Sequence, residues 1–276
     1  MLIAVVLAVA GLVVSASQIV PAGATTFHAA GDRPKPTIVL EHGAWADASS
    51  WTGEVHLLQA DGYTVYAPPN PLRGLANDAA TLAGFLSTIP GPIVLVGHSY
   101  GGMVITNAAT GNANVKALVY VNAFIPAQSE TAFGLTAARP GSCVGSANAF
   151  TAVPYPSAPA GDFDTYLKAG PDAPYPGFAQ CFANGLPPSQ AAVLAATQRP
   201  IAFSAGSDPS GVPAWKTTPS WSLIGTADQV IPPAEQLFMS QRAKAHITEI
   251  DAGHLSLISN PGAVTRVIIA AARATR

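Results

Sequence analysis

The chain has 276 residues, a formal net charge of −2 and a charged fraction of only 10%. This length suffices for one large domain with a well-covered core. Since the sequence contains no run of Lys or Arg that would form a basic surface, we expect no nucleic-acid partner.

An apolar leader comes first in the chain. Residues 2–14 carry no charge, and the small-residue sequence Ala-Gly-Ala, which ends at Ala24, follows them. This pattern is typical of a secretory signal peptide, although no Lys or Arg precedes the apolar core. We therefore expect a signal peptide at 1–24 and one domain at 25–276 that is secreted or extracytoplasmic. Because the apolar character continues to Val20, an uncleaved membrane anchor is the alternative.

Short apolar runs that predict strands alternate with segments that predict helices along the rest of the chain. This alternation implies right-handed crossovers and a mainly parallel sheet flanked by helices, which is the α/β class. We expect Asn77 to cap the helix that it begins. The predicted strands are 37–40, 63–67, 92–96, 115–121, 221–225 and 246–250, and the predicted helices are 50–60, 77–89, 103–109, 233–244 and 261–273.

The most informative motif lies between the third of these strands and the helix that follows it. Residues 97–101 read Gly-His-Ser-Tyr-Gly, the pattern G-x-S-x-G. Such a strand-to-helix turn needs small flanking residues, and it lifts the serine hydroxyl above the sheet. Ser99 is therefore the candidate nucleophile, and the backbone N–H of Tyr100 is a candidate donor to an oxyanion.

Two further candidates follow later strands of the same sheet. Asp228 comes just after the strand 221–225, and His254 comes in the loop after the last strand. The chain order Ser, Asp, His is the one expected when all three side chains project from the carboxyl edge of one parallel sheet. Asp251 is a rival for the acid role, but it shares the loop of His254 and would have difficulty reaching the far side of the imidazole.

These residues carry a resemblance to the α/β-hydrolases. The segment 40–45 (Leu-Glu-His-Gly-Ala-Trp), followed by Trp51, resembles the H-G-A…W segment of the plant methylesterase and hydroxynitrile lyase branch, and of similar exported bacterial esterases. The resemblance implies an α/β-hydrolase fold and a serine esterase that requires no metal or cofactor. It also implies that the Ala44 N–H is the second oxyanion donor, opposite Tyr100.

Three positions depart from the pattern of the relatives. Leu255 follows His254, whereas the cyanohydrin-cleaving members carry a lysine nearby, so ester hydrolysis is favoured over lyase chemistry. Glu41 stands where the family usually has an apolar residue, and a buried carboxylate there is costly unless it is paired. Asn122 occupies a place where some relatives carry an acid, but it is uncharged and cannot replace Asp228.

The implied reaction is hydrolysis of carboxylic esters of small or apolar substrates through an acyl-enzyme. Ser99 attacks the carbonyl, His254 takes its proton, and Asp228 orients the imidazole. The partner is thus a small-molecule ester, with no stable membrane partner unless the leader is uncleaved. Hydrolysis of lactones or other acyl compounds, a haloperoxidase-like side activity and a non-catalytic ligand-binding protein on the same fold are the alternatives.

Residues from about 127 to 219 interrupt the alternation with many prolines and aromatic residues. We expect this stretch to be an irregular cap insertion over the edge where Ser99 stands, because long structureless loops are uncommon in compact domains. A flexible surface loop is the alternative. The candidate residues of an apolar substrate pocket are Trp45, Tyr155 and Phe178.

The chain contains two cysteines, Cys143 and Cys181. In an oxidising compartment they would form one disulfide that ties this insertion together. Two separate thiols are the alternative, since the sequence does not define the Cα separation that a bridge demands. The sequence leaves the oligomeric state open.

Overall fold

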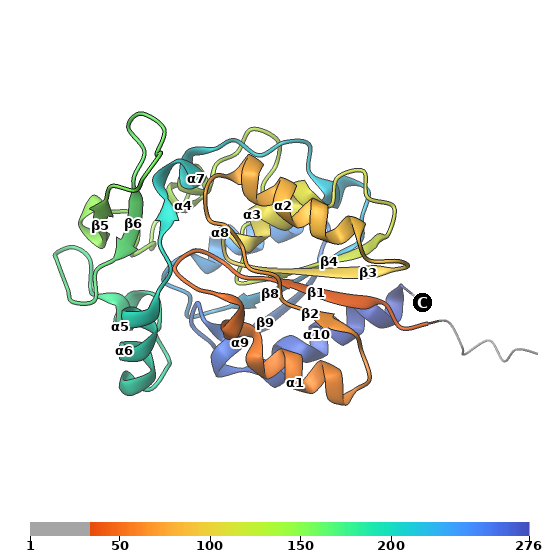
Figure 1. Cartoon of the computed structure of the whole chain (residues 1–276). Helices are drawn as coiled ribbons and strands as arrows, with labels where there is room; N and C mark the ends of the chain where they lie inside the picture. Colours follow the sequence, from red (N-terminus) through yellow and green to blue (C-terminus); the bar gives the residue numbers. More distant parts are fainter. Residues whose placement is uncertain (1–33, 276) are drawn as a thin grey trace, which may run out of the picture. The chain divides into compact units, whose positions relative to one another are not determined.

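A six-stranded parallel sheet organises the computed structural model, which describes residues 34–275. The strand order is β2-β1-β3-β4-β8-β9, and every neighbouring pair is parallel (Figure 1). This is the mainly parallel sheet that the alternating pattern predicted. The strands are β1 (Thr37–Glu41), β2 (Val65–Tyr66), β3 (Ile93–His98), β4 (Val115–Val121), β8 (Ser220–Gly225) and β9 (His246–Ile250).

Helices cover both faces of this sheet (Figure 1). On one face α10 packs against β3, β4 and β8 and against α1, and on the other α3 packs against β1, β3 and β4 beside α2. The short α9 lies with α1 and α10, and α8 lies against β8 and β9. The helices are α1 (Thr52–Ala60), α2 (Leu75–Ser87), α3 (Gly101–Ala108), α8 (Pro233–Arg242), α9 (Ser256–Ser259) and α10 (Pro261–Ala274), and the 3-10 turn η1 (Ala48–Trp51) precedes α1.

The central strands are mostly apolar because helices cover both of their sides. All six residues of β3 are buried, whereas most of β9, at the edge of the sheet, is exposed. A strand that is buried on both faces reads as a continuous apolar run, which explains why β3 and β4 were predicted closely. The predicted strand 63–67 shrinks to the two residues of β2, which lies at the opposite edge and, within residues 34–275, pairs only with β1.

Helix α2 begins earlier than predicted, and Asn77 is not its cap. The N-cap is Gly74, which has a φ of 122°. The carboxylate of Asp208, far along the chain, accepts a hydrogen bond from the Leu75 N–H at 2.8 Å. This helix start is therefore satisfied by a tertiary contact, which no local signal around Asn77 encodes.

The insertion between β4 and β8 is more regular than predicted. It contains a second, antiparallel sheet of order β5-β6-β7, whose strands lie together with α5 and α6 beyond one end of the main sheet (Figure 1). This sheet was not predicted because its strands are very short and lie among many prolines and aromatic residues. The elements are α4 (Ala132–Ala137), η2 (Ala147–Ala149), β5 (Phe150–Val153), β6 (Asp164–Leu167), α5 (Phe178–Cys181), α6 (Pro188–Thr197), β7 (Ile201–Ala202), α7 (Phe203–Ser207) and η3 (Ala214–Lys216).

The expected signal peptide and its cleavage point at Ala24 lie outside the described residues. The alternative membrane anchor lies in the same segment. Among residues 34–275, no helix combines the length and the apolar character needed to cross a bilayer.

Candidate active site

Ser99 stands on a sharp turn between β3 and α3, with a φ of 52° in the left-handed region. A Cβ on Gly97 would lie 2.7 Å from the carbonyl oxygen of Gly101, and a Cβ on Gly101 would lie 2.6 Å from that of Glu41. Both flanking glycines are therefore required by close packing of backbone against backbone. A serine held at positive φ stores strain that the surrounding elements must compensate, as is common at functional sites.

Ser99, His254 and Asp228 form one continuous hydrogen-bonded chain. The His254 Nε2 lies 2.9 Å from the Ser99 Oγ, and its Nδ1 lies 2.9 Å from the Asp228 Oδ2. All three residues are buried, and they follow β3, β8 and β9 at one edge of the sheet. Asp251, the rival acid, is exposed.

Four further groups donate hydrogen bonds to the Asp228 carboxylate. The backbone N–H groups of Val230 and Ile231 donate to Oδ1 at 2.8 and 3.1 Å. The side-chain amides of Asn122 and Gln236 donate to Oδ2 at 2.9 and 2.8 Å. Together with His254 they fix the orientation of a buried carboxylate and stabilise its charge.

Gln236 was missed by the sequence reasoning, and Asn122 was considered only as an uncharged substitute. Asn122 directly follows β4, as Ser99 directly follows β3, and this shared position at the strand ends is a signal that the sequence contains. Gln236 lies on α8 and offers no comparable signal, because the approach of that helix to Asp228 is a tertiary feature.

His42 orients the loop that carries the predicted oxyanion donor Ala44. The Asn70 N–H donates to the His42 Nε2 at 2.9 Å, so the proton of the neutral ring is on Nδ1, which donates to the Gly43 carbonyl at 2.9 Å. Burial is the main cause that lowers the pKa of His42 to about 4, so the ring is neutral at pH 7. In a trans peptide the carbonyl and the following N–H point in opposite directions, so the Ala44 N–H is turned away from His42.

His98, the residue before Ser99, holds the loop of His254. Its Nε2 lies 3.0 Å from the His254 carbonyl oxygen, so this nitrogen carries the proton and donates. The two imidazole rings lie 4.8 Å apart between centroids. Burial lowers the pKa of His98 well below the usual histidine value, which keeps the ring neutral.

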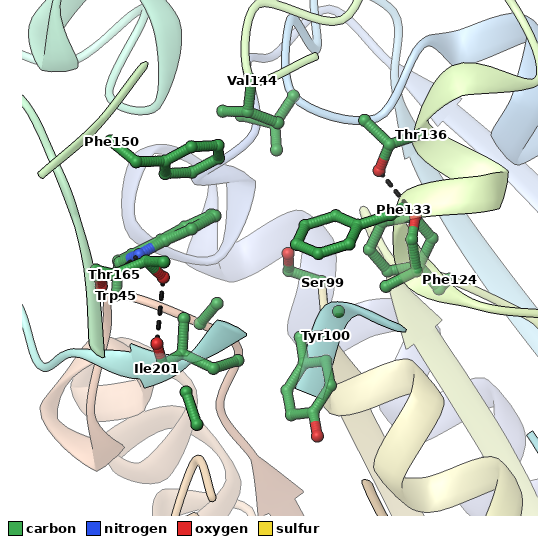
Figure 2. A pocket seen from close by; sticks show the side chains of 15 residues that line it. Trp45, Ser99, Tyr100, Phe124, Phe133, Thr136, Val144, Phe150, Thr165 and Ile201 are labelled. Atoms are coloured by element: carbon green, nitrogen blue, oxygen red, sulfur yellow. Dashed lines mark hydrogen bonds between the residues drawn. The ribbon is translucent and has the colours of Figure 1, made fainter. Parts of the chain in front are cut away.

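Ser99 faces a small inner cavity of about 50 Å³. Figure 2 shows Trp45 and Phe150 on one side of the serine, and Phe133 and Phe124 on the other. The rings of Trp45 and Phe150 stack with their centroids 5.7 Å apart. Both predicted oxyanion residues, Ala44 and Tyr100, also line this cavity.

The polar side chains around the inner cavity donate their hydrogen bonds to other groups of the protein and not into the cavity. The Trp45 Nε1 donates to the Thr165 carbonyl at 3.0 Å, and the Tyr100 hydroxyl donates to Asp78 at 2.9 Å. The hydroxyl groups of Thr136 and Thr165 donate to backbone carbonyls (Figure 2). The lining includes no charged side chain. In the part of the chain that the structure describes, no cluster of three or more His, Cys, Asp or Glu is placed to bind a metal ion.

Of the three predicted pocket residues, only Trp45 lines the inner cavity. Phe178 is buried against Phe182, with 5.1 Å between ring centroids. The Tyr155 hydroxyl donates to Asp162 at 2.8 Å, and the Arg73 guanidinium lies over its ring. Tyr155 and Phe178 are therefore not part of this lining, because aromatic content indicates an apolar lining but not which rings point inward. The aromatic residues of the insertion that do so are Phe133 and Phe150.

The predicted disulfide joins Cys143 to Cys181, with 5.8 Å between their Cα atoms. The backbone N–H of Cys143 donates to the Gln229 carbonyl, next to Asp228, at 2.7 Å. Phe182, which follows Cys181, packs its ring against His254 with 5.2 Å between centroids. The bridge thus connects a segment that is bonded beside Asp228 with a segment that packs against His254.

Glu41 ends β1 and is buried next to the turn that carries Ser99. Burial, with a smaller contribution from the negative charge of Asp78, raises the pKa of Glu41 well above its usual range. This shift favours the neutral, protonated carboxyl group, which avoids the cost of a buried unpaired charge.

A model of the alpha/beta hydrolase family matches residues 38–267. The match spans the sheet from β1 to β9 together with all three residues of the hydrogen-bonded chain. The protein therefore belongs to the alpha/beta hydrolase family, which confirms the fold class and the resemblance that the motifs indicated.

The relatives are named for several activities. A carbendazim hydrolyzing esterase from Nocardioides sp. (strain SG-4G) is 33% identical over 110 residues, which are 35% of this chain and 46% of that relative, so the match spans about half the length of that protein. A pyrethroid hydrolase from Sphingobium faniae JZ-2 has a similar structure, with a TM-score of 0.64, 20% identity and coverage of 87% and 98% of the two chains. Tomato methylketone synthase I has a TM-score of 0.69 and 21% identity, with coverage of 88% of this chain and 100% of that one. Polyneuridine aldehyde esterase has a TM-score of 0.67 and 19% identity, with coverage of 86% of this chain and 99% of that one.

Proposed function

We propose that this protein is a serine esterase that hydrolyses uncharged carboxylic esters. The observation that carries the proposal is the chain Asp228–His254–Ser99, in which both hydrogen bonds measure 2.9 Å. A buried serine, histidine and carboxylate in this order form a nucleophile, a general base and an orienting acid. Membership of the alpha/beta hydrolase family supports the same chemistry.

The first half of the reaction forms an acyl-enzyme. The Ser99 Oγ attacks the ester carbonyl carbon while its proton moves to the His254 Nε2, giving a tetrahedral intermediate. When this intermediate collapses, the bond to the alkoxy oxygen breaks, and His254 returns the proton to the leaving alcohol. Asp228 holds the Nδ1–H tautomer of the imidazole and stabilises its charge while both protons move.

The second half releases the acid by the same route. A water molecule gives its proton to His254 and attacks the acyl carbon, and collapse of this second intermediate returns the proton to the Ser99 Oγ. The carboxylic acid leaves and the free enzyme is restored, so one ester and one water give one acid and one alcohol.

The backbone N–H groups of Ala44 and Tyr100 are the proposed oxyanion donors. Both residues line the inner cavity, and His42 turns the Gly43–Ala44 peptide so that its N–H points away from the His42 ring. A donor of this kind contributes roughly 3 kcal/mol of transition-state stabilisation.

The lining of the inner cavity supports a neutral, apolar substrate. It contains no charged side chain, and its threonine, tryptophan and tyrosine donors are engaged by other groups of the protein. A charged group moved into such a site would lose its hydration without gaining a partner. The named esterase and hydrolase relatives are consistent with an ester substrate.

We further propose that the mature protein is exported, starting after Ala24, with residues from about 127 to 219 as a cap over the site. The apolar residues 2–14 support cleavage by a signal peptidase. The Cys143–Cys181 bridge supports an oxidising compartment. Mass spectrometry of the protein recovered from outside the cytoplasm tests both points, since a mature chain beginning at Thr25 with two fewer hydrogens than the dithiol is expected.

Reaction with a fluorophosphonate tests the esterase proposal directly. Intact-mass analysis should show one adduct on the wild-type protein and none on the Ser99→Ala variant. The wild-type protein should also hydrolyse short neutral esters, and the variant should not. A folded wild-type protein that takes up no adduct and hydrolyses no ester would instead favour a ligand-binding protein on the hydrolase fold.

A further inference from the structure

A second, larger cavity adjoins the inner one. This outer cavity has a volume of about 470 Å³. Five residues line both cavities and form the wall between them, namely Phe133, Thr136, Val144, Phe150 and Thr165. The two cavities therefore adjoin each other at residues of the insertion and not at residues of the main sheet.

Three phenylalanine rings lead from this wall toward the surface. The ring of Phe133 lies 5.1 Å from that of Phe203, and the ring of Phe203 stacks on that of Phe163 with 4.8 Å between centroids. Phe203 is 38% exposed although it is a large apolar side chain. A row of aromatic rings that reaches solvent provides edges and faces on which a planar aromatic group can pack.

The outer cavity is as free of charge as the inner one. Its remaining lining consists of small or apolar residues, and no charged side chain contributes to it. The Ser146 hydroxyl in this lining already accepts a hydrogen bond from the Asn148 N–H. Apolar contact is consequently the main interaction that this cavity offers to an occupant.

The volumes of the two cavities suit parts of a substrate that differ in size. An apolar cavity of roughly 150 Å³ can hold a benzene molecule. The inner cavity, at about 50 Å³, is well below that size, and the outer cavity, at about 470 Å³, is well above it. With Ser99 in the inner cavity, an ester can place only a compact group beside the serine and must extend its larger part past Phe133.

The position of the Phe133 ring depends on Gly206 of α7. A Cβ on Gly206 would lie only 2.3 Å from the ring, so the glycine leaves the space that the ring occupies. Figure 2 shows the ring beside Ser99, facing Phe150 across the inner cavity. Phe133 is thus the side chain that limits the size of the inner cavity on this side.

We propose that the outer cavity binds the bulky aromatic part of an uncharged ester whose other part is compact, and that Phe133 enforces this asymmetry. This inference rests on the proposed esterase function. It names the substrate class as esters that join a small acyl or alkyl group to a large aromatic group.

Matched pairs of esters test the inference without changing the reactivity of the scissile bond. One pair is methyl hexanoate and methyl 5-(2-naphthyl)pentanoate, and the other is pentyl acetate and 5-(2-naphthyl)pentyl acetate. In at least one pair the naphthyl ester should have a kcat/KM about tenfold higher, as expected for burial against aromatic rings. An ester with a naphthylpentyl group on both sides should be a poor substrate.

Two variants locate the effect. Phe203→Ala should remove most of the preference for the naphthyl member of the pair. Phe133→Ala should merge the two cavities and raise the rate on the doubly bulky ester relative to the singly bulky ones. Phe238→Ala is the matched control, because Phe238 is 42% exposed but lines neither cavity, and it should keep the wild-type preference.

Binding to the inactive Ser99→Ala variant separates the inference from the function on which it rests. The naphthyl fluorescence should change saturably on binding, and adding Phe203→Ala should weaken the affinity about tenfold. If the wild-type protein hydrolyses short esters but shows no naphthyl preference and no such binding, the outer-cavity proposal is wrong and the esterase proposal stands. If binding is seen but no ester is hydrolysed, the outer cavity binds aromatic groups, but the esterase proposal is wrong and the substrate class falls with it.

Discussion

Asn122 and His254 donate to the same carboxylate oxygen, the Oδ2 of Asp228, each at 2.9 Å. The Asn122 Oδ1 in turn accepts a hydrogen bond from Ser256, two residues after the histidine. A single amide therefore connects Asp228 with the loop that carries His254.

We predict that Asn122→Ala lowers kcat by about 10- to 100-fold with little change in KM. A hydrogen bond to a charged group contributes roughly 1.5–3 kcal/mol, and its loss here would loosen the orientation of Asp228 without touching the substrate cavity. Steady-state kinetics on a short ester measure the effect. Asn114→Ala, at the opposite end of β4, is the control and should retain wild-type kinetics; an equal kcat in both variants would show that the amide has no positioning role.

The cysteine bridge should stabilise the fold. Replacing both Cys143 and Cys181 by Ala removes a crosslink between residues 38 apart, which corresponds to about 4 kcal/mol of unfolding free energy in the chain-entropy account. Urea unfolding of the double variant measures the loss. Reduction of the wild-type protein should give the same midpoint as the variant, and an unchanged midpoint on reduction would contradict the prediction.

From the burial of Glu54 we predict that stability falls as the pH rises from acid to alkaline values. This residue of α1 is fully buried, and neither of its carboxyl oxygens has a hydrogen-bond partner among the described residues. Burial raises the pKa of Glu54 to about 9. The folded state therefore retains a proton that the unfolded state releases near pH 4.5, so stability falls as the pH rises from about 4.5 to 9.

Glu54→Gln should remove this dependence. Between pH 6 and 9 the wild-type protein should lose on the order of 4 kcal/mol more than the variant, at about 1.4 kcal/mol per pH unit. Thermal unfolding across this range measures the difference. Glu249→Gln, at an exposed position on β9, is the control and should leave the wild-type curve unchanged; parallel curves for wild type and Glu54→Gln would refute the assignment.

From the lowered pKa of His42 we predict that stability falls as the pH falls below neutral, which is opposite to the effect of Glu54. Its pKa is lowered to about 4, so the unfolded state takes up a proton near pH 6.5 that the folded state accepts only near pH 4. Stability is consequently present above pH 6.5 and is lost as the pH falls toward 4, by up to about 3 kcal/mol. Chemical unfolding at pH 7 and pH 4.5 should show a smaller loss in His42→Gln, whereas His56→Gln, at an exposed position, should behave as wild type.

Much of the fold was predictable because burial on both faces makes the central strands of the sheet continuous apolar runs. The bounds of β4 and β9 coincide with the predicted ranges, and those of β1, β3 and β8 differ by one or two residues. The chain order of Ser99, Asp228 and His254 was equally informative, because parallel strands bring their carboxyl ends to one edge.

The features that escaped prediction depend on contacts between distant segments. The start of α2 depends on Asp208, and in the antiparallel sheet of the insertion β6 pairs with β7, where Asp164 lies opposite Ala202. Side-chain direction was equally hidden. Nothing local in the sequence distinguishes Phe133, which reaches Ser99, from Phe178, which packs into the interior.

The inner cavity has no charged side chain in its lining, and this also affects release of the product. Hydrolysis converts a neutral ester into an acid that ionises in water at neutral pH. A carboxylate has no counter-ion in this lining, so its affinity for the site falls as soon as it forms. The same walls that admit the substrate thus favour departure of the anionic product, and the protein should resist product inhibition even when acid accumulates.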